Sequence, residues 1–296
     1  MLAAMAAFIF NDTLVKLVAA TMPPGEIMAL RGLFASTLTL GLVLANGHGR
    51  SMPSVFSPRV AIRALLEAAV AFLFIAALAR LPLANITAIM QATPVVLTVM
   101  TVVLGIERVG WRRALAICVG FGGVLVIVRP APSGFDVYAL VALGAAFLVA
   151  GRDLVTRFVD PRIPSLLITL STTLAVGAAG ALLGIGETWT APTLHDLVLL
   201  AGAAALVTLG NFGIITAFRH ADVSVVSPFR YTIVIFSIGL GYVVFGDLPD
   251  ALACLGILLI AGSGIYTIHR DHLTRRAALA PQPSVVLPRP DSTPPA

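Results

Sequence analysis

The chain of 296 residues is 58% hydrophobic and only 11% charged, with a mean hydropathy of +1.00 and a net charge of +5. A soluble domain carries roughly 25% charged residues, so this composition excludes a water-soluble globular protein and indicates a membrane protein. The basic residues lie in short connections between apolar segments, without a basic patch interleaved with aromatic residues, which argues against nucleic-acid binding.

Ten mostly apolar segments follow one another along the chain, each close to the roughly 20 residues that a membrane-spanning helix needs. They cover residues 1–20, 27–45, 60–79, 84–106, 111–128, 137–157, 165–185, 197–217, 223–245 and 251–268. The first segment lacks the basic region and cleavage pattern of a signal peptide, so we expect it to be a retained spanning helix. Residues 277–296 are rich in proline and are expected to form a disordered cytoplasmic tail.

Basic residues are distributed unevenly between the alternating connections. One side of the predicted membrane holds Arg50, Arg59, Arg63, Arg108, Arg112, Arg113, Arg157, Arg162, Arg219, Arg270, Arg275 and Arg276, and the other holds Lys16, Arg80 and Arg129. Because basic connections stay in the cytoplasm, this asymmetry predicts a multi-pass protein of the cytoplasmic (inner) membrane with both termini in the cytoplasm. That topology requires an even number of spans, and ten satisfies it.

An internal repeat becomes visible when the sequence is shifted by 140 residues. The shift pairs Pro24 with Pro164 and Glu107 with Asp247, close to the two ends of the repeat. The predicted units cover residues 1–130 and 137–268. Since each unit contains five helices and five is odd, the two units would cross the bilayer in opposite directions, as in many secondary transporters. The predicted fold is therefore an all-α integral membrane protein of ten transmembrane helices, arranged as two inverted five-helix repeats.

The end of each predicted repeat has a common pattern. Residues 106–130 (IERVGWRRALAICVGFGGVLVIVRP) run from an acidic residue through a basic cluster into a glycine-rich helix that ends at Arg-Pro. Residues 246–270 (GDLPDALACLGILLIAGSGIYTIHR) form the corresponding stretch of the second repeat. This pattern resembles the EamA-type transporters of the drug/metabolite transporter superfamily, and the resemblance covers about residues 1–268.

Two shorter motifs narrow the resemblance. Asn11 and Asp12 with Lys16, and the run SPFRY at residues 227–231, resemble the branch that holds amino-acid exporters and S-adenosylmethionine carriers. The resemblance implies a basket-like helical bundle with a central cavity lined by both halves. It does not by itself select a substrate, because one fold serves many solutes.

Ionisable side chains inside the apolar segments are costly unless they are paired or functional. Asp12 and Lys16 lie four residues apart on one helix face, so either they neutralise each other or Asp12 faces the cavity, where it titrates or meets a substrate ammonium. Arg31 lies inside the second segment, where it either holds the substrate carboxylate together with Arg230 or, as the favoured interpretation, forms an ion pair with a carboxylate of the protein. Its candidate partners are Asp12, Asp153 and Glu26.

Arg230 is the favoured substrate-binding residue. It follows Pro228, which removes a backbone donor and tends to open a helix beside a polar cavity. A guanidinium at this depth is suited to bidentate capture of a carboxylate. Phe229 and Tyr231 are expected to shape the pocket for the rest of the substrate.

Further polar candidates lie in other segments. Gln91 and Pro94 fall, by the 140-residue shift, at the depth of the polar part of the ninth segment. Gln91 either lines the cavity or bonds across two helices, and the same alternatives hold for Asn11 and Asn211. Pro94 and Pro228 are the predicted helix breaks.

Two charged pairs are expected to be structural. Arg152 and Asp153 lie near the cytoplasmic end of the sixth segment, where they would extend to the membrane surface or pair. Glu67 follows Arg63 by four residues, and the favoured interpretation is a solvated pair at a helix end.

The motifs that would indicate an enzyme or an ATP-driven pump are absent from the sequence, and its five histidines lie outside the apolar segments. We therefore expect no cofactor, no metal site and no enzymatic activity. The predicted partners are a small-molecule substrate and the lipid bilayer, and a monomer is compatible with the arrangement. The predicted function is a secondary transporter that moves small polar metabolites, above all amino acids and in the export direction. The alternatives are an uptake carrier for S-adenosylmethionine or another metabolite, an intramembrane enzyme, and a membrane scaffold subunit.

Overall fold

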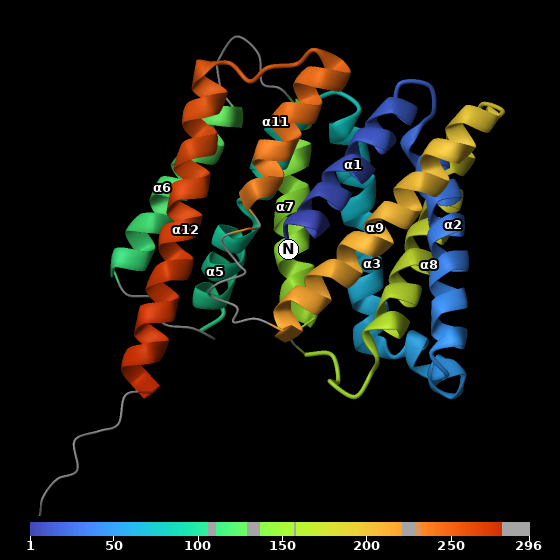
Figure 1. Ribbon diagram of the computed structural model, residues 1–296, viewed down its shortest axis with the longest axis horizontal. Helices are drawn as coiled ribbons and strands as arrows, with labels where there is room; N and C mark the ends of the chain where they lie inside the picture. Colours follow the sequence, from blue (N-terminus) through green and yellow to red (C-terminus); the bar gives the residue numbers. More distant parts are fainter. Residues whose placement is uncertain (106–110, 129–136, 157, 221–228, 230, 280–296) are drawn as a thin grey trace, which may run out of the picture.

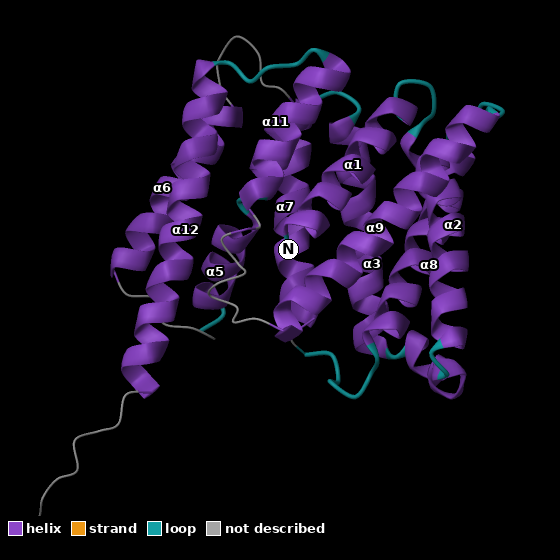
Figure 2. Ribbon diagram, in the orientation of Figure 1, coloured by secondary structure: helices purple, strands orange, loops and turns teal. Residues whose placement is uncertain are grey.

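The computed structural model describes residues 1–105, 111–128, 137–156, 158–220, 229 and 231–279. Within these residues the chain consists of helices and connections, without a strand (Figure 2). The helices are α1 (Leu2–Val18), α2 (Pro24–Ala45), η1 (His48–Phe56), α3 (Pro58–Leu78), α4 (Leu83–Met90), α5 (Thr93–Val103), α6 (Trp111–Val128), α7 (Val137–Thr156), α8 (Ser165–Leu183), η2 (Gly184–Gly186), α9 (Leu194–His220), α11 (Thr232–Phe245) and α12 (Ala251–Leu279).

The apolar segments predicted from the sequence coincide with these helices. Six described stretches are long and apolar enough to cross a membrane, and α6, α11 and α12 contribute shorter apolar stretches. Large apolar side chains are exposed along the outer faces of most helices, as expected where lipid replaces water. The prediction of an all-helical, multi-pass membrane protein is therefore confirmed.

Several helix ends differ from the prediction, each for a local reason. α2 begins at Pro24, because the missing N–H of proline costs nothing in the first turn of a helix. α9 begins at Leu194 behind a capping box, in which Thr193 Oγ1 accepts from the amide of Asp196 and Asp196 Oδ2 accepts from the amide of Thr193. α12 continues to Leu279, because no proline or glycine interrupts the charged stretch before Pro281. The first residues of the predicted tail are thus helical, and residues 280–296 lie outside the described part.

The fourth apolar span is broken in the middle. α4 ends at Met90 and α5 begins at Thr93, with residues 91–92 forming a turn between them. Pro94 has no N–H to offer to the carbonyl oxygen of Met90, and that oxygen accepts from Thr93 Oγ1 at 2.7 Å instead. The interruption therefore lies directly before the predicted break at Pro94, whereas Pro228 lies outside the described residues.

The helix pair α2 and α8 closes one end of the bundle, at the right of Figure 1. The two helices run antiparallel, since Gly25 lies beside Gly184, and Gly32 meets Gly177 nearer the middle. Beyond the end of α8, both carboxylate oxygens of Glu187 accept from the amide of Gly25, at 3.0 and 3.2 Å. A carboxylate in this position complements the positive end of the α2 dipole.

The helix pair α6 and α12 closes the opposite end of the bundle, at the left of Figure 1. These helices also run antiparallel, because Gly120 faces Ser263 and Gly256 faces Ile127. Small residues at such crossings let two helices approach closely in a membrane.

Between the two end pairs, α1 packs against α9 and α3 packs against α7. The α1–α9 contact is close and apolar: a Cβ added at Gly210 would lie 3.1 Å from the ring of Phe8. The main apolar core joins α1, α3 and α4, where Ile9, Ile75 and Ile86 are fully buried. The contact between α3 and α7 is polar, and it borders the cavity described next.

Candidate functional site

A cavity of about 200 Å³ lies among α2, α3, α7, α8 and α9. Its polar lining residues are Arg31, Arg63, Glu67, Arg152, Thr169, Thr172, Thr173, Thr208 and Asn211. The threonines of α8 lie three and four residues apart, so that they share one helix face. Three arginines, one glutamate and a set of neutral hydrogen-bonding groups therefore meet in a space of metabolite size.

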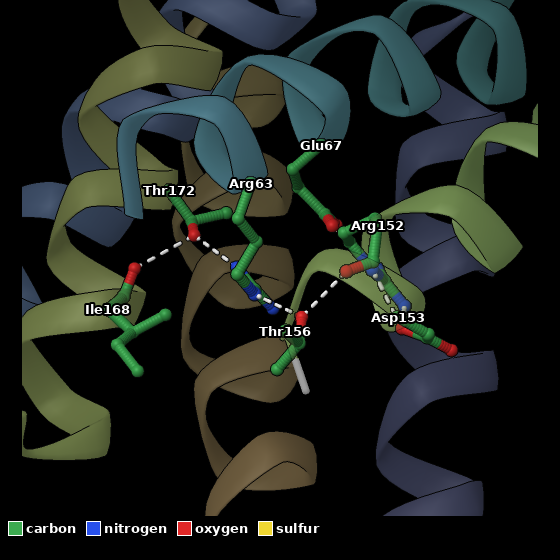
Figure 3. Close-up of polar contacts among 7 residues, drawn as sticks. All are labelled: Arg63, Glu67, Arg152, Asp153, Thr156, Ile168 and Thr172. Atoms are coloured by element: carbon green, nitrogen blue, oxygen red, sulfur yellow. Dashed lines mark hydrogen bonds and ion pairs between the residues drawn. The ribbon is translucent and has the colours of Figure 1, made fainter. Parts of the chain in front are cut away.

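The charge of Arg152 is matched by two carboxylates. Its Nη1 donates to Glu67 Oε2 at 2.5 Å, and its Nη2 and Nε donate to Asp153 Oδ1 at 2.7 and 3.0 Å. The side chains of Arg152 and Glu67 are 20% and 24% exposed, so this ion pair lies in the wall of the cavity and not in bulk solvent. The pair joins α3 to α7 directly (Figure 3).

Arg63 is held between two threonines of other helices (Figure 3). Its Nε donates to Thr156 Oγ1 at 3.0 Å, and its Nη1 donates to Thr172 Oγ1 at 2.6 Å. Each of these hydroxyls in turn donates to a carbonyl of its own helix, Thr156 to Arg152 and Thr172 to Ile168. The arrangement fixes the guanidinium of Arg63 across α7 and α8.

Arg31 lies on α2 at the cavity wall. It makes no hydrogen bond or ion pair with the other residues that the structure describes, although Asp12 and Glu67 are within electrostatic range. Asp12 accepts from the side-chain amide of Asn11 at 2.9 Å. Of the carboxylates considered as partners for Arg31, Glu26 accepts from the amide of Thr190, at 3.1 Å.

The structure brings some of the predicted site residues together and leaves others apart. Arg31 and Asn211 line the cavity, whereas Asp12 and Asn11 lie behind Arg31 on α1 and are not among its lining residues. Gln91 caps the C-terminal end of α4.

The remaining predicted residues lie around the start of α11. Tyr231 is its buried N-cap residue, and Phe229 is 42% exposed. Arg230 and Pro228 lie outside the described residues, so the structure does not place the residue that the sequence favoured for the carboxylate.

Two expected ion pairs are replaced by other contacts. Glu67 binds Arg152 of α7 instead of Arg63 of its own helix, because the cross-helix geometry allows a direct ion pair at 2.5 Å. Lys16 donates to the carbonyls of Leu78 and Leu81 at the C-terminal end of α3, where helix carbonyls lack partners, and not to Asp12.

The positions of Arg63, Glu67 and Arg152 in the lining of the cavity were not predicted from the sequence. The signal that could have found them is the concentration of charged groups near one end of each of two segments, opposite a threonine-rich face of α8. Among the described residues no cluster of three or more His, Cys, Asp and Glu side chains could hold a metal ion.

The chain is similar in sequence to a known family and to several known proteins. Residues 1–129 match the model of the EamA-like transporter family. The chain is 28% identical over 264 residues to the pseudopaline exporter CntI of Pseudomonas aeruginosa, covering 88% of this chain and 92% of the exporter. It is 25% identical to the S-adenosylmethionine uptake transporter of Rickettsia bellii (88% and 89% covered). It is 28% identical to the riboflavin transporter of Brucella anthropi (86% and 92% covered).

A solved protein structure is also similar. It shares 19% identical residues and a TM-score of 0.63 over 93% of this chain and 97% of its own, a likeness that concerns the fold.

Proposed function

Because the chain belongs to the EamA-like transporter family and is a membrane transporter rather than an enzyme, we propose that it exports small polar metabolites of the amino-acid class. The proposed mechanism is secondary transport by alternating access, with residues 1–130 and 137–268 as two inverted halves. In this proposal both termini lie in the cytoplasm, as the distribution of arginines predicts. Reporter fusions to the C-terminus that are active only on one side of the membrane test the orientation.

The helix packing supports the inverted arrangement. The 140-residue shift relates α2 to α8 and α6 to α12, and both of these pairs run antiparallel. The same shift exchanges the contact between α1 and α9 with the contact between α7 and α3. A two-fold axis in the membrane plane produces this pattern, because it reverses the direction of each helix relative to its counterpart.

The observation that carries the substrate proposal is the cavity itself. Its volume of about 200 Å³ is below the roughly 300–1,000 Å³ of pockets for drug-sized ligands, which favours a solute of amino-acid size. Guanidinium groups, threonine hydroxyls and the amide of Asn211 suit a carboxylate and its hydrogen-bonding neighbours. Arg31 with Arg230 is the proposed carboxylate site, and Asp12 stays the predicted partner of the substrate ammonium, although it is not among the residues that line this cavity.

The other predicted residues keep secondary roles in this proposal. Gln91, Asn11, Phe229 and Tyr231 stay predicted substrate-binding residues, although none of them lines the cavity among α2, α3, α7, α8 and α9. Pro94, at the break between α4 and α5, would be the hinge of the first half.

Counterflow into proteoliposomes tests the proposal without assuming a driving force. Proteoliposomes that contain the purified protein are loaded with an unlabelled solute. Labelled amino acids, S-adenosylmethionine and riboflavin are then offered from outside. We expect accumulation of amino acids, and loss of it in Arg31→Gln. Accumulation of S-adenosylmethionine or riboflavin alone would replace amino acids by that solute as the substrate, and no accumulation of any solute would contradict the proposal.

A further inference from the structure

The three arginines of the cavity differ in the hydrogen bonds that their guanidinium groups donate. Arg152 gives three hydrogen bonds to Glu67 and Asp153, so its charge is compensated within the protein. Arg63 donates only to uncharged hydroxyls, and Arg31 donates to none of the described residues. Two guanidinium groups therefore face one cavity without a bound carboxylate.

The contacts of Arg63 hold it in position and leave donors open. A threonine hydroxyl has a single hydrogen, and both Thr156 and Thr172 give theirs to a carbonyl four residues earlier. Their oxygens can therefore only accept from Arg63, which fixes its orientation. An arginine has five N–H donors, and Arg63 uses two of them here, so that three have no partner among the described residues in a side chain that lines the cavity.

Arg31 reaches the same cavity from α2. Its half-buried guanidinium lies within electrostatic range of Glu67, as does that of Arg63. An arginine in a membrane-spanning helix is costly when its donors are unsatisfied, so its retention at a cavity indicates a ligand that accepts from it. An oxyanion is the natural acceptor, because its oxygens match the planar fork of guanidinium.

We propose that Arg31 and Arg63 together form an oxyanion subsite that takes a carboxylate of the transported solute, with the side-chain amide of Asn211 as a neutral partner. This inference rests on the proposed function only in that the bound solute is also transported. Binding of a carboxylate to the two arginines can be measured independently of transport. The subsite retains Arg31 of the proposed carboxylate site and adds Arg63, which the sequence had placed in a structural pair with Glu67. In this arrangement Arg152 binds Glu67, so that Glu67 does not pair with Arg31 or Arg63.

Acetate is the test probe, since it is the smallest carboxylate and fits a cavity of this size. The thermal midpoint of the purified protein is measured against acetate concentration, with acetamide as the uncharged counterpart and ionic strength held constant. Binding to the folded state raises the midpoint. We expect acetate alone to raise it, and its affinity to fall about tenfold or more in Arg31→Gln and in Arg63→Gln.

Arg59→Gln is the matched control. Arg59 lies one turn before Arg63 on α3 but donates to the carbonyl of Phe158 and does not line the cavity. This variant should keep the response to acetate. An equal response to acetamide, an unchanged response in both cavity variants, or no response of the wild-type protein would overturn the subsite.

A second measurement on the wild-type protein avoids variants that fold poorly. Phenylglyoxal modifies accessible guanidinium groups, and mass spectrometry of peptides reports each site. Acetate should slow labelling of Arg31 and Arg63 and leave Arg59 unaffected, and uniform rates would contradict the proposal. If counterflow fails for every solute while acetate binding depends on the two arginines, the subsite stands and the proposed export function falls.

Discussion

Removal of the guanidinium of Arg152 should destabilise the protein far more than neutralisation of Glu67. Arg152→Gln leaves Glu67 and Asp153 as two neighbouring carboxylates in the cavity wall, with three charge-assisted hydrogen bonds lost. Loss of one partner of a buried pair costs about 3–5 kcal/mol. Because these side chains are 20% to 34% exposed, water in the cavity recovers part of that cost, and we expect about 2–3 kcal/mol.

Glu67→Gln should cost about 1 kcal/mol or less, because the amide oxygen still accepts from Arg152 and Asp153 still balances its charge. Thermal unfolding in detergent at fixed pH compares the two variants, and a loss of 2–3 kcal/mol corresponds to a midpoint roughly 5–10 °C lower for a chain of this size. The double variant should be less destabilised than the sum of the single ones, since the pair is removed together. Equal losses for the two single variants, or strict additivity, would refute this description of the network.

The remaining predictions concern the packing that surrounds the site. Gly32→Ala should lower the free energy of unfolding by about 1–3 kcal/mol, because the new methyl overlaps the backbone of Gly177. Gly177→Ala, whose methyl meets its nearest neighbour at 3.4 Å, should be tolerated and should leave the thermal midpoint unchanged. Gly246→Ala should lower the free energy of unfolding by about 1–2 kcal/mol, because the residue has a φ of 70°. Gly239→Ala in α11 is the control, because the new methyl has open space around it. Equal thermal midpoints of the two variants would contradict the argument. Lys16→Met should cost about 1–2 kcal/mol by leaving two carbonyls at the end of α3 without their donor, and an unchanged midpoint would show that those bonds contribute nothing.

The helical layout could be predicted because it depends on properties that a sequence displays directly. A bilayer requires long apolar stretches with internal backbone hydrogen bonds, so hydropathy alone locates most of the helices. The ends of the helices were less predictable, since α2 begins at Pro24 and not at residue 27. The end of α12 was misjudged, because its charged continuation carries no helix breaker and a helix need not stop where the bilayer does.

The polar contacts were harder to predict, because the partner of an arginine can lie on another helix, far away along the chain. The spacing of Arg63 and Glu67 suggested a pair within one helix, yet a direct partner for Glu67 was available on α7. Lys16 likewise lies four residues from Asp12 but reaches carbonyls of another helix. Spacing within one helix contributes only about 0.2–0.5 kcal/mol per pair, which a cross-helix contact easily exceeds.

The proposed 140-residue repeat relates the helix packing of the two halves better than it relates their charged side chains. The 140-residue counterparts of Arg63 and Glu67 are Ala203 and Val207, and the counterpart of Arg152 is Asp12. The α3–α7 contact therefore carries ion pairs, whereas the equivalent α1–α9 contact is apolar and closely packed. Backbone packing tolerates either set of side chains, so the two halves can share a fold while only one of these interfaces binds charge.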